Sequence, residues 1–191
     1  FDRRTGRARH RGAGPEQQKR DEQWNMTHGK PRNDCHPPMP ALRDNVMTDE
    51  QLIAAARAAA LKAYAPYSNF SVGCAILSVD GEMVTGANME NACYRLGVCA
   101  EISALTAAQA RFGLGKIARI AVAGGDGSGA ALAGVSSVTP CGGCRQSILE
   151  AAQLSGRDIE IICASGDGTT VECHRINTLI PHGFGPAALV D

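Results

Sequence analysis

Cys99-Ala100-Glu101 and Pro140-Cys141-Gly142-Gly143-Cys144-Arg145 are the two stretches around which the chain is organised. Together they place three cysteines at metal-ligand spacing and a glutamate two residues after the first cysteine. Three thiolates bind zinc well, and a site with three protein ligands keeps its fourth position open for catalysis. A carboxylate that is not a ligand can move protons beside the metal. The sequence therefore predicts a catalytic zinc site with Cys99, Cys141 and Cys144 as ligands and Glu101 as the acid–base group.

Both halves of this motif fall where a helix is expected to begin. Cys99 precedes the apolar-periodic run 102–112, and Pro140 precedes a second run, as proline often does at a helix start. A helix N-terminus carries partial positive charge and unpaired N–H groups, which stabilise thiolates. We therefore expect both helix starts to favour the metal-binding form of cysteine. Arg145, next to Cys144, would offset part of the negative charge of three thiolates.

Three other interpretations fit parts of the motif. Cys141-Gly142-Gly143-Cys144 alone is compatible with a redox dithiol, which would leave Cys99 and Glu101 without a role. A structural zinc site would need a fourth ligand, for which Cys93 and, more distantly, His174 are available. Glu101 by itself is a common first-turn acid of a helix. Only the catalytic zinc site uses all of these residues together.

The composition is that of a soluble globular protein. The chain has 191 residues, of which 44% are apolar and 20% charged, enough for one domain with a real core. No apolar run approaches a membrane span and the basic N-terminus lacks a signal-peptide core, so we expect a cytoplasmic protein without membrane contact. Eight cysteines in that setting favour reduced thiols, some of them metal-binding, over a disulfide framework. Cys74 and Cys163 lie in apolar runs and are expected in the core.

Charge divides the chain into two parts. Residues 1–46 hold 10 basic and 6 acidic residues, a net +4, whereas residues 47–191 hold 9 and 13, a net −4. The acidic balance of the second part argues against a nucleic-acid-binding surface. Residues 1–46 lack any helical or strand period, so we expect a disordered basic N-terminal extension, with an anion-binding arm as the alternative. The catalytic domain is expected over 47–191, with Met47 as a possible natural start.

Apolar periodicity and turn residues predict an αββαβαββ order, which implies an α/β fold with about five strands between helices. Thr48 and Gln51 form a capping-box pattern at the start of the first helix. The expected elements are a helix over 48–64, strands over 70–79 and 82–87, a helix from 99, a strand over 117–123, a helix over 140–154, strands over 159–164 and 169–173, and a helical turn over 176–180.

Motifs along most of the chain extend the pattern beyond the two cysteine stretches. They are Tyr64-Ala65-Pro66-Tyr67-Ser68-Asn69-Phe70-Ser71-Val72-Gly73, Asn88-Met89-Glu90-Asn91-Ala92, Cys99-Ala100-Glu101, Pro140-Cys141-Gly142-Gly143-Cys144-Arg145-Gln146, and Leu179-Ile180-Pro181 with Phe184. With these motifs in this order, residues 47–186 resemble the cytidine deaminase family, of the small homotetrameric zinc-dependent type. The zinc motifs match the general signature of zinc nucleobase deaminases. The resemblance implies a three-layer α-β-α sandwich with a mixed five-stranded sheet.

The resemblance also implies roles for individual residues. One zinc ion per subunit would be bound by the three cysteines, with Glu101 as the proton shuttle and Arg145 behind the ligands. A neighbouring subunit of a homotetramer would complete each site. The residues implied in nucleoside binding are Phe70 against the pyrimidine ring, Asn88 and Glu90 at the ribose 3′-hydroxyl with Asn91 beside them, Ala100 and Thr139 at the base, and Tyr94 and Phe184 at a partner's nucleoside.

The implied reaction is hydrolytic deamination of cytidine and 2′-deoxycytidine to uridine and 2′-deoxyuridine with release of ammonia, a step of pyrimidine salvage. One position departs from the family pattern. Ile102 stands where three-cysteine members often carry an arginine that offsets thiolate charge. Blasticidin-type deaminases can carry an apolar residue there, so a related cytosine nucleoside is the alternative substrate. A non-catalytic structural zinc module is the alternative outside enzymes.

Overall fold

The computed structural model describes residues 47–189, and the predicted extension over 1–46 lies outside them, so that domain boundary stays a prediction. Its main elements follow the predicted order. They are α2 (Asp49–Ala60), β1 (Phe70–Ser78), β2 (Met83–Ala87), α3 (Ala100–Arg111), β3 (Ile117–Asp126), α4 (Gly142–Ser155), β4 (Glu160–Ser165), β5 (Val171–Arg175) and α5 (Ile176–Leu179), with short 3₁₀ turns at Tyr94–Leu96, Leu114–Lys116 and Pro186–Leu189.

The strands form one mixed sheet in the order β2-β1-β3-β4-β5. β1 is antiparallel to both β2 and β3, β3 is parallel to β4, and β4 is antiparallel to β5. The parallel pair is joined through α4, as a parallel connection requires. The predicted mixed five-stranded sheet is therefore confirmed.

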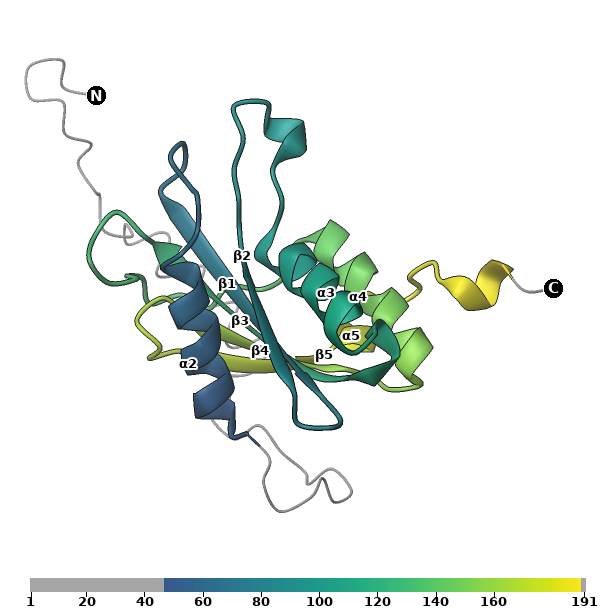
Figure 1. Ribbon diagram of the computed structural model, residues 1–191. Helices are drawn as coiled ribbons and strands as arrows, with labels where there is room; N and C mark the ends of the chain where they lie inside the picture. Colours follow the sequence, from purple (N-terminus) through teal and green to yellow (C-terminus); the bar gives the residue numbers. More distant parts are fainter. Residues whose placement is uncertain (1–46, 190–191) are drawn as a thin grey trace, which may run out of the picture. The chain divides into compact units, whose positions relative to one another are not determined.

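Helices cover both faces of the sheet (Figure 1). On one face, Leu52, Ile53 and Ala56 of α2 pack against inward residues of β1, β3 and β4. On the other face, buried residues of α3, α4 and α5 join the alternate residues of the same strands in a second core cluster. The alternation along each strand divides the core in two, because successive side chains point to opposite faces. The fold is the predicted three-layer α-β-α sandwich.

Two glycines bring helices unusually close to the sheet. A Cβ on Gly73 of β1 would lie 2.0 Å from the Ala56 carbonyl oxygen of α2. A Cβ on Gly86 of β2 would lie 2.4 Å from the Ala104 nitrogen of α3. Any side chain there would push the helix backbone away. Gly86 thus sets the height of α3, the helix that carries Glu101, above the sheet.

Two element ends differ by three residues or more from the sequence prediction, and β5 begins and ends two residues later than expected. The first helix ends at Ala60 and not near Tyr64, because Tyr64 donates from its N–H to the Asn88 carbonyl (3.0 Å) and accepts from the Glu90 N–H (2.7 Å). β3 continues to Asp126, past the expected end at Ala123, because its glycines keep pairing with β1. In both cases tertiary pairing overrides local propensity.

The predicted core cysteines, Cys74 and Cys163, are both fully buried free thiols. Cys93, Cys99, Cys141 and Cys144 are also free. Cys173 differs, since it is disulfide-bonded, and there the expectation of reduced thiols is wrong. Among the described residues, no helix is both long and apolar enough to cross a membrane.

Candidate active site

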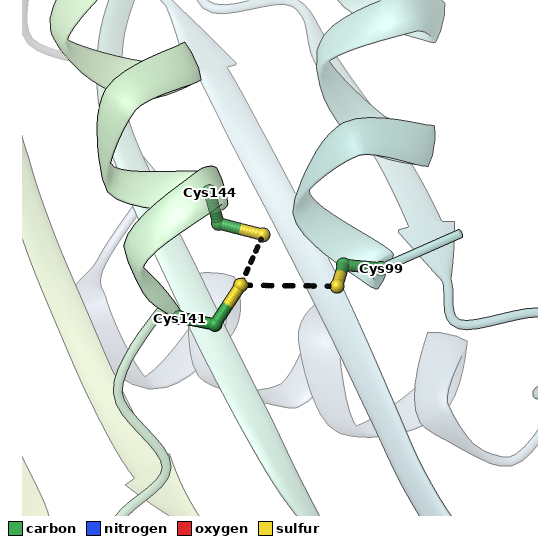
Figure 2. Close-up of side chains that lie close together, drawn as sticks. All are labelled: Cys99, Cys141 and Cys144. Carbon is green, nitrogen blue, oxygen red and sulfur yellow. Dashed lines mark hydrogen bonds between the residues drawn. The ribbon is translucent and has the colours of Figure 1, made fainter. Parts of the chain in front are cut away.

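Three cysteine sulfurs converge between the starts of α3 and α4 (Figure 2). Cys99 is the N-cap residue of α3, Cys141 is the N-cap residue of α4, and Cys144 lies in the first turn of α4. The Cys141 sulfur is 3.5 Å from that of Cys144 and 4.0 Å from that of Cys99. All three sulfurs lie within 4.8 Å of one another. The predicted meeting of residues some forty positions apart is therefore confirmed.

The two helix starts act differently on their thiols. The pKa of Cys141 is lowered, first by the N–H of Cys144 and to a smaller degree by that of Gly143, although neither reaches full hydrogen-bond geometry to the sulfur. The pKa of Cys99 is raised, mainly by burial. The pKa of Cys144 is raised strongly, by burial first and then by the charge of Glu101. The expected thiolate preference thus holds at Cys141 and is wrong at Cys99 and Cys144.

Glu101 is a buried acid on α3, with only 5% of its surface exposed. Within residues 47–189 its carboxylate accepts no hydrogen bond, and its charge raises the pKa of the thiols of Cys144, Cys99 and Cys74. A nearly buried acid beside three thiols is unusual, because carboxylates are seldom buried unless they are paired or bind a metal. A divalent cation between the sulfurs would turn this repulsion into attraction.

The donor set fits zinc. Tetrahedral zinc with sulfur at about 2.3 Å needs sulfurs about 3.8 Å apart, close to the separations of 3.5 and 4.0 Å between the Cys141 sulfur and the other two. In the described part of the chain the cluster includes only these three cysteines. Cys93 is not part of it, and His174 lies on β5 facing Glu172 at 3.4 Å. A closed four-ligand site is therefore not formed by these residues, nor is an isolated dithiol.

Arg145 is used for positioning more than the sequence suggests. Its guanidinium donates to the Pro140 carbonyl (2.8 Å) and to the Leu179 carbonyl (3.1 Å). These bonds fasten the strand-to-helix turn before Cys141 to the end of α5. Burial raises the pKa of the Cys163 thiol, and the positive charge of Arg145 opposes only a small part of that rise. Arg145 therefore holds the turn before Cys141 in place against the end of α5.

Three residues of the predicted nucleoside group are joined through backbone contacts. The Asn88 side chain accepts from the Val72 N–H (2.8 Å) and donates to the Phe70 carbonyl (2.9 Å). The Glu90 carboxylate accepts from the Tyr67 N–H (2.9 Å), and hydrogen bonds from the turn before β1, first from the Ser68 hydroxyl and then from this N–H, lower its pKa. The loop that begins at Asn88 is thereby tied to the entry of β1.

The same loop is linked to the metal cluster. Met89 and Val98 exchange two backbone hydrogen bonds of 2.9 Å, and Val98 directly precedes Cys99. The other predicted site residues have the following contacts and exposures. Asn91 accepts from the Cys93 N–H (2.8 Å), Ala100 is fully buried, Thr139 is exposed just before Pro140, and Tyr94 and Phe184 are 79% and 62% exposed.

Two residues with clear contacts escaped the sequence analysis. Ser68 bonds both Glu90 and Phe70. Gln146 donates to the Phe184 carbonyl at 2.5 Å and so fixes the C-terminal segment on α4. Both lie inside motifs that the sequence analysis quotes, but a serine in a turn and a glutamine on a helix carry no chemical signal by themselves.

A cluster of three cysteines with a buried, uncoordinated acid, held at helix starts beside a mixed sheet, defines a zinc-dependent hydrolase. Residues 46–155 match the family described as "cytidine and deoxycytidylate deaminase zinc-binding region". The chain belongs to this family, whose members hydrolyse a C–N bond.

Its relatives include the cytidine deaminase of Mycobacterium tuberculosis, 39% identical over 127 residues, which cover 66% of this chain and 82% of that protein. The cytidine deaminase of Halalkalibacterium halodurans is 36% identical over 138 residues, covering 72% and 95% of the two chains. Among solved structures, the cytidine deaminase from Burkholderia pseudomallei superposes with a TM-score of 0.63 at 40% identity, covering 72% of this chain and all of that one.

Proposed function

We propose that the chain catalyses hydrolytic deamination of cytidine and 2′-deoxycytidine to uridine and 2′-deoxyuridine, with release of ammonia, as a step of pyrimidine salvage. The observation that carries the proposal is the buried Glu101 carboxylate, unpaired within the described residues and set beside three clustered cysteine sulfurs. An acid in this position serves hydrolysis, since it is close to the metal without being needed as a ligand.

Cys99, Cys141 and Cys144 would hold the zinc ion, which when bound lowers the pKa of water toward neutrality. Glu101 would accept the proton of the attacking water and deliver it to ring N3 as C4 is attacked; it would then take the proton of the new C4 hydroxyl and pass it to the departing amine, which leaves as ammonia while the C4 carbonyl forms. Because its surroundings are buried, the carboxylate would exchange protons with the reactants and not with bulk solvent. Arg145 would hold the ligand turn in place during these steps.

The nucleoside would lie across the loops next to the cluster. Phe70, 44% exposed at the start of β1, offers a ring face to the pyrimidine. Asn88 and Glu90, with Asn91 beside them, would bind the ribose 3′-hydroxyl from the loop that leads to Cys99. The Ala100 backbone and the Thr139 carbonyl would contact the base and the leaving amino group. Sugar contacts made away from the reacting carbon supply binding energy that can be used in the transition state.

A homotetramer is part of the proposal. Tyr94 and Phe184 are exposed aromatic residues, and an apolar groove of about 780 Å³ runs between α3 and α4. Large exposed apolar surfaces of this kind suit subunit contacts. In such an assembly Tyr94 and Phe184 would reach a partner's nucleoside. Light scattering of the purified protein checks the assembly, and a monomer that is fully active would contradict shared sites.

Ile102 bears on the choice of substrate. It is half-buried, packs against the core cluster and lines the groove between α3 and α4 together with Leu105. An apolar side chain suits this place, which leaves the zinc-site charge to be balanced by the helix starts. A deaminase of a blasticidin-like nucleoside remains the second candidate, because enzymes of that class can carry an apolar residue at the position of Ile102.

The test is a spectrophotometric assay of the zinc-loaded protein with cytidine, 2′-deoxycytidine, free cytosine and blasticidin S. We expect turnover of the two nucleosides and poor turnover of cytosine, which lacks the sugar contacts. Turnover of blasticidin S alone would replace the proposal by the second candidate. Absence of turnover with every substrate in protein that holds one zinc per chain would contradict both.

A further inference from the structure

Ser68 stands at the centre of a hydrogen-bond network that joins two loops. Its hydroxyl donates to Glu90 Oε1 at 2.5 Å and accepts from the Phe70 N–H at 3.0 Å. The N–H groups of Tyr67 and Ser68 donate to the other oxygen, Glu90 Oε2, at 2.9 and 3.3 Å. One serine hydroxyl thus connects the acid of the second loop with the aromatic residue of the first.

The turn around Ser68 is held in a fixed shape. Asn69 has φ of 56°, in the left-handed region that asparagine tolerates better than most residues. Its N–H donates to the Ala65 carbonyl (3.0 Å), and its carbonyl accepts from the Gly127 N–H (2.8 Å). The turn therefore directs the hydroxyl of Ser68 and the ring of Phe70 from one rigid unit.

The network leaves Glu90 one place for a ligand. The pKa of Glu90 is lowered, first by the Ser68 hydroxyl and then by the Tyr67 N–H, so the carboxylate stays ionised and can only accept. A carboxylate offers about four lone-pair sites. The described residues fill two on Oε2 and one on Oε1. The remaining site, on Oε1, suits one hydroxyl group.

We propose that Ser68 is a positioning residue for sugar recognition, which aims the free lone pair of Glu90 Oε1 at the 3′-hydroxyl of the nucleoside. The inference rests on the proposed function, in which Glu90 binds that hydroxyl. Ser68 touches neither the reacting carbon nor the metal, so its effect passes through Glu90. Loss of the Ser68 hydroxyl should therefore lower kcat/KM only for substrates that carry the 3′-hydroxyl.

Exposure favours this role over a purely structural one. Ser68 is exposed, so water would satisfy both the hydroxyl and the carboxylate if the contact were absent, and the contact contributes little to stability. Ser78, at the other end of β1, provides the contrast. It is 2% exposed, and its hydroxyl accepts from the N–H groups of Asp80 (3.2 Å) and Glu82 (3.0 Å) in a hairpin far along the strand.

The experiment compares 2′-deoxycytidine with 2′,3′-dideoxycytidine, which lacks only the 3′-hydroxyl. Ser68→Ala should lower kcat/KM for 2′-deoxycytidine about tenfold, mostly through KM, and leave that for the dideoxy substrate within about twofold. Ser68→Thr, which keeps the hydroxyl, should restore most of the loss. Ser78→Ala should lower the melting temperature and change both substrates alike. If dideoxy turnover is too slow to follow, its inhibition constant against 2′-deoxycytidine replaces kcat/KM.

Each failure has its own signature. A wild-type protein that turns over neither nucleoside contradicts the proposed function and the inference with it. A wild-type protein that is active but does not distinguish the two substrates contradicts the role of Glu90. Clear discrimination by the wild type that Ser68→Ala retains, or equal loss on both substrates, overturns the role of Ser68 alone.

Discussion

The start of α3 and the start of α4 each place a cysteine at the N-cap, yet they are built differently. The first turn of α3 is buried, with Glu101 5% exposed and the Ala100 carbonyl oxygen 2.7 Å from where a Cβ on Gly86 would lie. The N-cap end of α4 is open, although Cys144 later in the same turn is buried. Cys141 and the two glycines after it are exposed, and a Cβ on either glycine would meet nothing within 4 Å.

The difference explains why one helix start lowers the pKa of its cysteine and the other does not. N–H groups of the α4 turn lie beside the Cys141 sulfur, whereas at Cys99, which is also an exposed residue, partial desolvation of the thiol is the largest influence and raises its pKa. A helix N-terminus therefore stabilises a thiolate only where the chain brings the sulfur onto its N–H groups. We infer that the open start captures the metal, while the buried start isolates the acid.

The largest expected effect comes from removing a ligand of the open start. Cys144→Ser should lose the zinc ion and all measurable activity, because serine does not supply a thiolate and the cluster formed by the described residues has no fourth ligand to replace it. Cys93→Ser is the matched control, since Cys93 is an exposed free thiol outside the cluster. Metal analysis and the deamination assay measure both. Loss of zinc from the Cys93 variant would instead support a structural zinc site with Cys93 as its fourth ligand.

Removing the acid of the buried start separates chemistry from metal binding. Glu101→Gln should keep about one zinc per chain and lower kcat about 10³–10⁴-fold, because an amide cannot carry the proton. Without the carboxylate charge, the variant should also lose the repulsion that raises the pKa of Cys144 in the metal-free protein. Activity within tenfold of the wild type would show that another group moves the proton.

Packing beneath the two starts gives the next effect. Gly86→Ala should destabilise the fold by about 3 kcal/mol, because the new methyl group would press on the backbone of α3. Gly142→Ala, on the open start of α4, should change stability by less than about 0.5 kcal/mol. Urea unfolding of both variants tests the pair. Equal changes in the free energy of unfolding would mean that the starts of α3 and α4 are packed equally tightly.

The sequence predicts the element order and the cysteine cluster well, because apolar periodicity and ligand spacing can be recognised within short stretches of the chain. The sequence does not show which hydrogen-bond partners the polar side chains have in the folded protein. Asn88 appears in the sequence as a ribose ligand, yet its amide bonds both Phe70 and Val72. Arg145 appears as a counter-charge, yet it donates to two backbone carbonyls. Such partners come from elements distant in sequence, so only the folded chain identifies them.

The smallest effect tests the thiols themselves. In zinc-stripped protein at about pH 7, Cys141 should react with iodoacetamide about five times faster than Cys99, because its lowered pKa yields more thiolate at that pH. The gain stays modest, since thiolates of lower pKa are weaker nucleophiles. The ratio should fall as pH rises and Cys99 also ionises.

Peptide mass spectrometry after brief labelling measures the order, and Cys144, which is buried with a raised pKa, should react last. Labelling of Cys99 ahead of Cys141 would show that the α3 terminus stabilises its thiolate after all. The two starts would then differ only in packing, and capture of the metal could not be assigned to α4. The predicted order instead makes Cys141 the first thiolate offered to an incoming ion, with Cys99 and Cys144 losing their protons as the metal binds.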